Sequence, residues 1–419
     1  MDVARLQKLL TLTTIIGLTL WFSASQSNAD RDRVIRIGMI APLTGPTSES
    51  GIALRQGAEF AVNEINAAGG INLNGTAYTL NLFVEDNEGK PEVGISAAER
   101  LISREKVHYL IGDAILSSVT MAIMELAPKY NIPIVSGESV SEAIVEKVMA
   151  DPEKYRYYWK MNFGSTAYAH TVFNTVTWLI DTGKFQPHKK RVFFIVEDTD
   201  YGRSNSKEAA RLFEEVGWST VATETVSMGH TEFYAQLNKL READTDVLVS
   251  IFTPLSSGVA LVKQFQELGV DALHIAIYYP SRPEFLQQVG EAAEGLLWTP
   301  LIFDPEHIDT HKGFATKIRK TYNVEPTLDH AYGYDAVYNA VDSIRRANSL
   351  EPNDIIRAVS TLDYKGVVGR YLFEESTHQV KAGPEFMPIP TAQIQKGRNL
   401  IVWPVQFATS EYRPQSWGK

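Results

Sequence analysis

Residues 34–46 read VIRIGMI-APLTGP, and a helix-like segment follows from Ala53 to Ala67. The first seven residues are rich in Val and Ile, which is typical of a buried strand. An apolar stripe at helical spacing runs through the later segment and consists of Leu54, Ala58, Ala61, Val62 and Ile65. Gly69-Gly70 then supplies a helix stop signal. This order predicts a strand, a loop and an amphipathic helix, the first half of a βαβ unit.

The same alternation continues along the chain. Strand-like runs are expected at 78–85, 107–111 and 132–135, with helices at 91–104, 118–130 and 142–149. After a polar, aromatic segment at 151–162 it restarts, with strands expected at 191–196, 220–226, 247–252 and 273–277 and helices at 167–181, 203–216, 233–243 and 257–268. We therefore predict an α/β protein of two Rossmann-like lobes, each with a doubly wound parallel sheet. The chain beyond about residue 301 is expected to complete these two lobes.

The N-terminus is typical of a cleaved signal peptide at residues 1–29. Arg5 and Lys8 precede an apolar run of 14 residues, and small side chains stand at Ser27 and Ala29. A membrane anchor is the alternative, but 14 helical residues span only about 21 Å of a bilayer core of about 30 Å. There is no cysteine for a lipid anchor. We therefore expect a periplasmic protein that is free of the membrane.

Composition excludes several classes of function. The 419 residues carry a formal net charge of −10, which argues against binding to nucleic acid or to an anionic membrane surface. The absence of cysteine excludes disulfides, thiol nucleophiles and Cys-ligated metals. His307 and His311 are four residues apart, but their surroundings indicate a loop or a helix start, and no metal site is expected.

Motifs of enzymes on α/β folds are absent from the sequence. The loop after the first strand lacks the Gly-x-Gly-x-x-Gly of dinucleotide sites. Neither a Gly-x-Ser-x-Gly elbow nor a phosphate-binding P-loop occurs. We therefore expect a protein that is not an enzyme and has no cofactor.

Six short runs carry a resemblance to a known family. In chain order they are IGMIAPLTGP (37–46), GAEFAVNEINAAGGI (57–71), YLIG (109–112), NIPI (131–134), DTDYGR (198–203) and EAAEGL (291–296). Together they resemble the type I periplasmic solute-binding proteins of ABC transporters, in the Leu/Ile/Val-binding family. The resemblance implies two lobes joined by three crossover strands, with a ligand buried between them by hinge closure.

The resemblance also implies lobe boundaries and partners. The crossovers are expected near 158–163, near 298–303 and after Gly369. The first lobe would then be 34–160 plus 302–368, and the second 161–300 plus 370–410. An ABC permease with its ATPase is the expected partner of a monomeric binding protein.

In the first lobe, candidate ligand residues follow two strands, because ligands of doubly wound sheets bind beyond the carboxyl ends of strands. Ser117 and Ser118 open a helix, where free N–H groups favour a carboxylate, although plain N-capping is the alternative. The resemblance implies that Gly137 and Ser139 supply a carbonyl and a hydroxyl to the polar head of an amino acid. Glu138 would either hold an ammonium group or face solvent.

In the second lobe, aromatic residues stand at the strand ends. The candidates are Tyr201, Phe252, Thr253, Tyr278 and Tyr279. Aromatic rings there would cover an apolar side chain or meet an ammonium group. In leucine-type binders the last of these positions carries an acid, whereas this chain reads IYYP at 277–280. This difference disfavours branched-chain amino acids and leaves an aromatic or less basic ligand, or an ammonium held by Asp200 or Glu138.

The loop from Thr44 to Ser50 is expected to face the same cleft, with Glu49 and Ser50 near the ligand. Two functions use the same closure and stay open at this point. One is uptake of a small polar solute, such as an amino acid or a related amide or carboxylate. The other is sensing, in which the closed form is presented to a receptor or sensor kinase.

Overall fold

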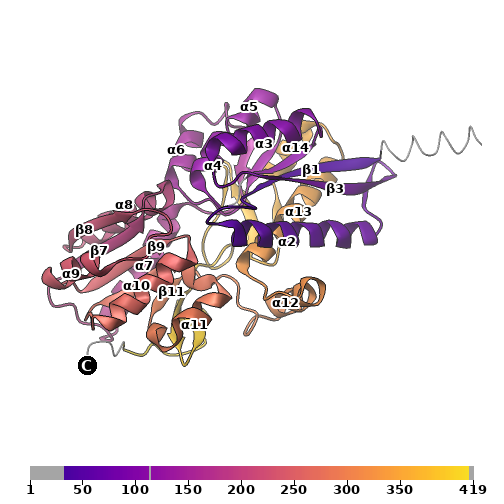
Figure 1. The fold of residues 1–419 in the computed structure, drawn as a ribbon. Helices are drawn as coiled ribbons and strands as arrows, with labels where there is room; N and C mark the ends of the chain where they lie inside the picture. The colour runs from indigo at the N-terminus through magenta and orange to yellow at the C-terminus, as the bar shows by residue number, and fades with distance from the viewer. Residues whose placement is uncertain (1–32, 113–114, 415–419) are drawn as a thin grey trace, which may run out of the picture.

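The computed structural model describes residues 33–112 and 115–414, and these form two α/β lobes (Figure 1). Within the described residues, the strands pair into one sheet of nine strands and one of seven. The predicted α/β fold of two lobes is therefore confirmed. The predicted signal peptide lies outside the described residues.

The first lobe surrounds the nine-stranded sheet. Its strand order is β12 (Asp363–Lys365), β13 (Arg370–Glu374), β14 (Gln379–Val380), β6 (Tyr158–Lys160), β5 (Ile134–Ser136), β4 (Tyr109–Gly112), β1 (Val34–Ala41), β3 (Thr76–Asp86) and β2 (Ile71–Leu73). Its helices are α2 (Ser48–Ala67), α3 (Pro91–Ser103), α4 (Ser117–Ile123), α5 (Leu126–Tyr130), α6 (Glu142–Ala150), α12 (Asp309–Tyr322), α13 (Leu328–Ala347) and α14 (Pro352–Ser360).

The second lobe surrounds the seven-stranded sheet. Its strand order is β16 (Arg398–Trp403), β15 (Thr391–Gln395), β11 (Leu297–Thr299), β10 (Leu273–Tyr278), β9 (Val247–Phe252), β7 (Arg191–Glu197) and β8 (Ser219–Val226). Its α-helices are α7 (Ser165–Asp181), α8 (Asp200–Glu215), α9 (Tyr234–Glu242), α10 (Leu255–Glu267) and α11 (Pro283–Val289).

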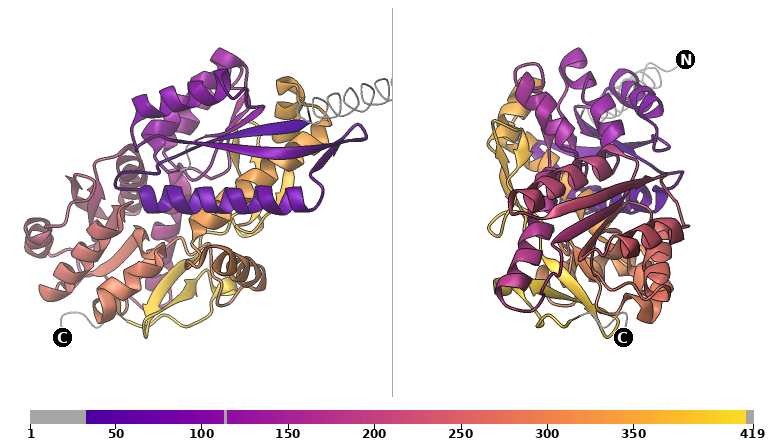
Figure 2. Two further views of the ribbon diagram at one scale, coloured as in Figure 1. Left: turned by 45° about the vertical axis from the view of Figure 1, so that its right-hand side comes forward. Right: turned by 90° about the vertical axis from the view of Figure 1, so that its left-hand side faces the viewer.

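Helix α2 shows how the sequence pattern becomes packing. All five residues of its predicted apolar stripe are buried. Helix α13 packs along α2, and two glycines allow the close approach. A Cβ atom at Gly57 would lie 1.9 Å from the His330 carbonyl oxygen, and one at Gly333 would lie 2.0 Å from the Leu54 carbonyl oxygen. Helices α3 and α4 lie on the opposite side of β1 and β3 (Figures 1 and 2).

Both sheets share one strand order. In the first lobe β3, β1, β4, β5 and β6 lie side by side and pair in parallel. In the second lobe β8, β7, β9, β10 and β11 repeat that arrangement. In each sheet the order reverses beside the first strand, which is the place where doubly wound sheets bind ligands at the carboxyl ends.

The chain passes between the sheets three times, after β6, after β11 and between β14 and β15. The first passage follows Lys160, the last residue of β6, and the second follows Thr299, the last residue of β11. The third differs from the prediction that the chain crosses after Gly369. Strands β13 and β14 complete the edge of the first sheet, where Gln379 of β14 pairs with Lys160 of β6. Residues 370–380 therefore belong to the first sheet, because a short edge strand carries no sequence signal for the sheet it joins.

Candidate ligand site between the lobes

A small cavity lies where the carboxyl ends of the two sheets meet. The first lobe contributes residues that follow β4 and β5, and the second lobe contributes residues from α7 and α8, from the loop after β9 and from the end of β10. The lining residues are Ile115, Glu138, Val140, Tyr168, Tyr201, Thr253 and Tyr278. The cavity has a volume of ≈ 20 Å³, about enough for one water molecule. A larger molecule therefore enters only when the lobes or their side chains move apart.

In the first lobe, the serines near the cavity tie two loops together. The Ser117 hydroxyl accepts a hydrogen bond from the backbone N–H of Ser141 at 3.2 Å. The hydroxyls of Ser139 and Thr120 are 2.5 Å apart. Ser117 and Ser139 are buried, and neither lines the cavity. Their hydroxyls thus brace the loop that presents Glu138.

A buried lysine lies beneath this loop, and no motif in the sequence singles it out. The Lys160 amine donates to the carbonyl oxygens of Ser139 at 3.2 Å and Phe163 at 2.5 Å. Burial lowers the pKa of Lys160 to about 7, although the attraction of Glu142 opposes the shift. Lys160 is the last residue of β6, directly before the first crossover. Its bonds to Ser139 and Phe163 therefore link the loop that carries Glu138 to the segment that passes between the lobes.

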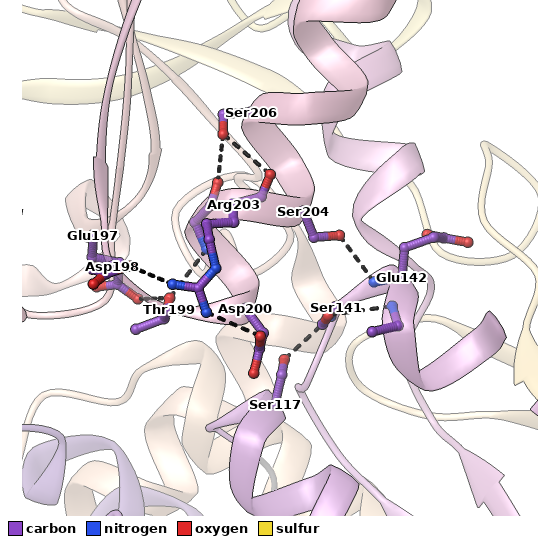
Figure 3. A network of polar contacts seen from close by, with 12 residues as sticks. Ser117, Ser141, Glu142, Glu197, Asp198, Thr199, Asp200, Arg203, Ser204 and Ser206 are labelled. Atoms are coloured by element: carbon purple, nitrogen blue, oxygen red, sulfur yellow. Dashed lines mark hydrogen bonds and ion pairs between the residues drawn. The ribbon is translucent and has the colours of Figure 1, made fainter. Parts of the chain in front are cut away.

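In the second lobe, a buried carboxylate fixes the wall of the cavity. Glu197 accepts hydrogen bonds from the backbone N–H and the hydroxyl of Thr253, both at 2.7 Å, and from the Thr199 hydroxyl at 3.0 Å. Burial raises the pKa of the Glu197 carboxyl. Thr199 also caps α8, because its hydroxyl accepts from the Gly202 N–H at 3.1 Å (Figure 3). Helix α8 thereby holds Tyr201 in the wall.

Two candidates for an ammonium partner occupy different environments. Asp200, the first residue of α8, pairs with Arg203 at 3.1 Å and does not line the cavity (Figure 3). Glu138 lines the cavity and is 8% exposed. Among the described residues, the Tyr201 hydroxyl has no hydrogen-bond partner. Glu138 and Tyr201 are therefore the polar groups placed to meet a solute.

The tyrosine pair at the end of β10 divides between cavity and core. Tyr278 has φ 76° and ψ −57°, close to the strained γ-turn values of about +75° and −65°. This turn directs Tyr278 to the cavity. Tyr279 is fully buried, contacts the rings of Phe252 and Phe285, and lies 2.9 Å from the Ser250 hydroxyl. Strain of this kind costs about 1–3 kcal/mol and is typical of functional sites.

Two sets of contacts join the lobes beside the cavity. In the first, which we call the hydroxyl contact, the Glu142 N–H donates to the Ser204 hydroxyl at 3.0 Å (Figure 3). The Thr166 hydroxyl donates to the Glu142 carboxylate at 2.9 Å. In the second, which we call the charged contact, Arg282 of the second lobe pairs with Asp329 and donates to Ser50 of the first lobe.

The structure brings together four of the ten predicted ligand residues. These are Glu138, Tyr201, Thr253 and Tyr278. It places Phe252 and Tyr279 in the core of the second lobe. The other four, Ser117, Ser118, Gly137 and Ser139, lie in the neighbouring loops without lining the cavity.

Several residues of the site carried no sequence signal that set them apart. Tyr168 lies in the first turn of α7, after a crossover rather than after a strand, and so escaped a search of strand ends. Arg282 and Asp329 are ordinary charged residues in the sequence, and only the fold pairs them. Ser50 was expected near the ligand, and it contacts Arg282 at the cavity's edge.

Two further features concern the described part of the chain. No group of three or more metal-ligating side chains occurs within residues 33–112 and 115–414. His307 binds Asp304 at 2.7 Å, and His311 accepts from the Asp304 N–H at 3.0 Å. No helix in the same ranges is long and apolar enough to cross a bilayer.

Comparison with known proteins agrees with this geometry. Residues 34–398 match the model of a family described as periplasmic binding protein. A Leu/Ile/Val-binding protein homolog from Brucella suis is 26% identical over 344 residues, covering 81% of this chain and 86% of that protein.

Solved structures show the same fold. The branched-chain amino acid transporter substrate binding protein from Streptococcus pneumoniae, in complex with isoleucine, superposes with a TM-score of 0.73 at 24% identity over 87% of this chain and 97% of its own. A solute binding protein of an ABC transporter from R. palustris, in complex with benzoate, gives 0.73 at 15% identity over 92% of this chain and 99% of its own. With its two lobes, its site at the facing strand ends and a family match over most of its length, the chain belongs to the periplasmic binding protein family.

Proposed function

We propose that this chain is the substrate-binding protein of an ABC uptake system and captures a small solute between its lobes. One observation carries the proposal: the described lining of a single cavity comes from both lobes, at the edge where the carboxyl ends of their strands lie. A solute that touches both lobes stabilises the closed form by its differential affinity for that form. Closure then buries the solute for delivery.

Glu138 and the surrounding tyrosines favour a solute with a positively charged amino group. The lining residues that the structure describes include one carboxylate and no basic side chain. The negative charge of a carboxylate shielded from water attracts a cationic group that enters the cavity. The faces of tyrosine rings also attract cations, and Tyr168, Tyr201 and Tyr278 all line the cavity. An amino acid or a related amine fits these groups better than a bare carboxylate does.

The proposed site consists of Glu138, Tyr168, Tyr201, Thr253 and Tyr278. Asp200 is left out because Arg203 already neutralises it outside the cavity. The Streptococcus pneumoniae relative binds isoleucine and the R. palustris relative binds benzoate. Relatives with this fold therefore bind solutes with and without an amino group, and Glu138 is the residue that would select for an amino group in this chain.

The partners follow from the same proposal. We expect a monomer, secreted by its signal peptide into the periplasm, that delivers solute to an ABC permease driven by an ATPase. Binding and release require no bond to be broken, so no catalysis is expected. The relatives compared above belong to transporters, which favours uptake over the sensory alternative.

A thermal-shift assay on residues 30–419 tests the proposal with matched pairs of solutes. Two pairs differ by one amino group: leucine and 4-methylpentanoate, and phenylalanine and 3-phenylpropanoate. In the third pair, benzylamine carries an aminomethyl group where benzoate carries a carboxylate. A solute at about 1,000 times its dissociation constant adds about 4 kcal/mol of stability, which raises the melting temperature by several degrees. We expect shifts only with the amine of a pair. Shifts only with the carboxylates would contradict the role of Glu138, and a wider panel of solutes with no shift at all would contradict solute capture.

A further inference from the structure

A buried ion pair connects the two lobes at the edge of the cavity. Arg282 lies in the second lobe, four residues after the cavity-lining Tyr278. Its guanidinium pairs with Asp329 at the start of α13 and donates to the Ser50 hydroxyl at the start of α2. The side chains of Arg282 and Asp329 are 6% and 2% exposed. One charge therefore belongs to each lobe, and both are shielded from solvent in this arrangement.

The burial of this pair is unusual within the molecule. The next most buried ion pair among the described residues joins His307 and Asp304, where the imidazole is 26% exposed and both residues belong to one segment. Exposed ion pairs contribute little to stability because water and salt screen them. A pair removed from water is different, since each charge then depends on its partner.

The pair also fixes a wall of the cavity. Arg282 donates to the Tyr278 hydroxyl at 2.8 Å, and its guanidinium carbon lies 5.4 Å from the centre of the Tyr278 ring. The Tyr278 hydroxyl donates in turn to Asp329 at 3.3 Å. On its other side Arg282 lines a second cavity of ≈ 180 Å³ beside the second crossover. The ion pair thus separates the two cavities and holds the strained Tyr278 in place.

Opening of the lobes replaces the contact between Arg282 and Asp329 by contacts of each group with water. Arg282 and Asp329 lie in different lobes, so separation of the lobes breaks their contact and hydrates both groups. In the closed arrangement, loss of either partner leaves the other charge buried without its direct counter-charge, although Glu138 also attracts Arg282. Loss of both charges removes the cost of taking them out of water together with the attraction between them. Each single substitution should therefore favour the open form, and the double substitution should restore closure.

We propose that Arg282 and Asp329 are positioning residues for solute capture, whose ion pair forms as the lobes close, holds Tyr278 against the cavity and allows both charges to be buried in the closed form. Neither residue lines the cavity formed by Glu138 and the three tyrosines, so the pair acts through Tyr278 and through the relative position of the lobes. The inference does not depend on which solute is bound.

Distance measurements between spin labels test the proposal without any solute. The chain has no cysteine, so Met149→Cys in α6 and Val216→Cys after α8 give one label on each lobe. Both positions are exposed, at 57% and 51%. The labelled parent is compared with Arg282→Gln, Asp329→Asn and the double variant. Arg370→Gln is the matched control, because Arg370 pairs with Asp363 at 2.6 Å on the surface of one lobe.

We expect the parent to show a short-distance population, and each single variant to lower the ratio of short to long distances at least tenfold. The double variant should return to within about threefold of the parent, and Arg370→Gln should equal it. Circular dichroism melting checks that each variant folds; if a single variant does not fold, the double variant decides. No short-distance population in the parent, unchanged single variants, or a double variant as open as the singles would overturn the proposal. A failed solute screen would leave this result standing, so the two proposals fail separately.

Discussion

The lobes meet through neutral hydroxyls on one side of the cavity and through buried charges on the other. At the hydroxyl contact, Ser204 and Thr166 bond to Glu142 near the surface. The bond from the Glu142 N–H to Ser204 is neutral and contributes about 0.5–1.5 kcal/mol, and the bond from Thr166 to the Glu142 carboxylate contributes about 1.5–3 kcal/mol. At the charged contact, Arg282 and Asp329 are shielded from water. Water can replace the bonds of the hydroxyl side when the lobes open, whereas the charged side defines the closed geometry.

The largest expected effect is at the charged contact. Asp329→Asn removes the anion that pairs directly with the buried Arg282 guanidinium and leaves only the more distant charge of Glu138, a loss of about 3–5 kcal/mol for a closed molecule. The variant should therefore populate an open form, with a larger radius of gyration in small-angle X-ray scattering than the parent. An unchanged radius of gyration would show that the ion pair does not control closure.

Glu138→Gln tests the cavity itself. The substitution keeps the shape and removes the charge that faces a bound ammonium. A hydrogen bond to a charged group contributes about 1.5–3 kcal/mol, so affinity for the amino acid with the largest thermal shift should fall roughly 10- to 100-fold in calorimetry. Asp200→Asn is the control and should leave affinity unchanged, because Asp200 pairs with Arg203 outside the cavity. Equal losses in both variants would remove Glu138 from its proposed role.

Lys160 predicts a dependence of stability on pH. Burial lowers its pKa from 10.5 to about 7, so between these values the unfolded chain holds a proton that the folded chain lacks. Stability should therefore rise with pH in this range, by up to about 1.4 kcal/mol per unit. Urea unfolding at pH 7.5, 8.5 and 9.5 should show this rise in the parent relative to Lys160→Met. Parallel curves for the two proteins would mean that Lys160 stays charged when folded.

The smallest effect is expected at the hydroxyl contact. Ser204→Ala removes one neutral bond between the lobes, and should lower the closed fraction by the equivalent of about 0.5–1.5 kcal/mol. Ser206→Ala is the control on the same helix, because the Ser206 hydroxyl bonds only to the Gly202 and Arg203 carbonyl oxygens of α8. Spin-label distances should change for Ser204→Ala alone. A larger effect at Ser204 than at Asp329 would reverse the comparison.

The fold could be predicted from the sequence because its signals are local and repeated. The apolar stripe of α2 and the alternating runs depend on residues close in the chain, and the structure buries that stripe as expected. The third crossover could not be predicted in the same way. Whether β13 and β14 join the first or the second sheet depends on a distant edge at Lys160, about which the local sequence is silent.

The site was predictable in position but not in detail. Strand ends pointed to Glu138, Tyr201, Thr253 and Tyr278, since the rule for doubly wound sheets depends on topology alone. The choice between Tyr278 and Tyr279 required the backbone angle of Tyr278. The partnership of Arg282 with Asp329 required the packing of two lobes. Contacts between distant segments are thus the part that a single sequence does not specify.

Hydrogen–deuterium exchange shows directly whether one bound solute contacts both lobes. Residues 30–419 would be compared with and without a mixture of the twenty standard amino acids at equal concentration. We predict slower exchange in the mixture in both lobes. The protected segments should be residues 136–140 in the first lobe and residues 199–203 and 253–257 in the second lobe. Protection confined to one lobe, or no protection at either place, would contradict capture of an amino acid between the lobes.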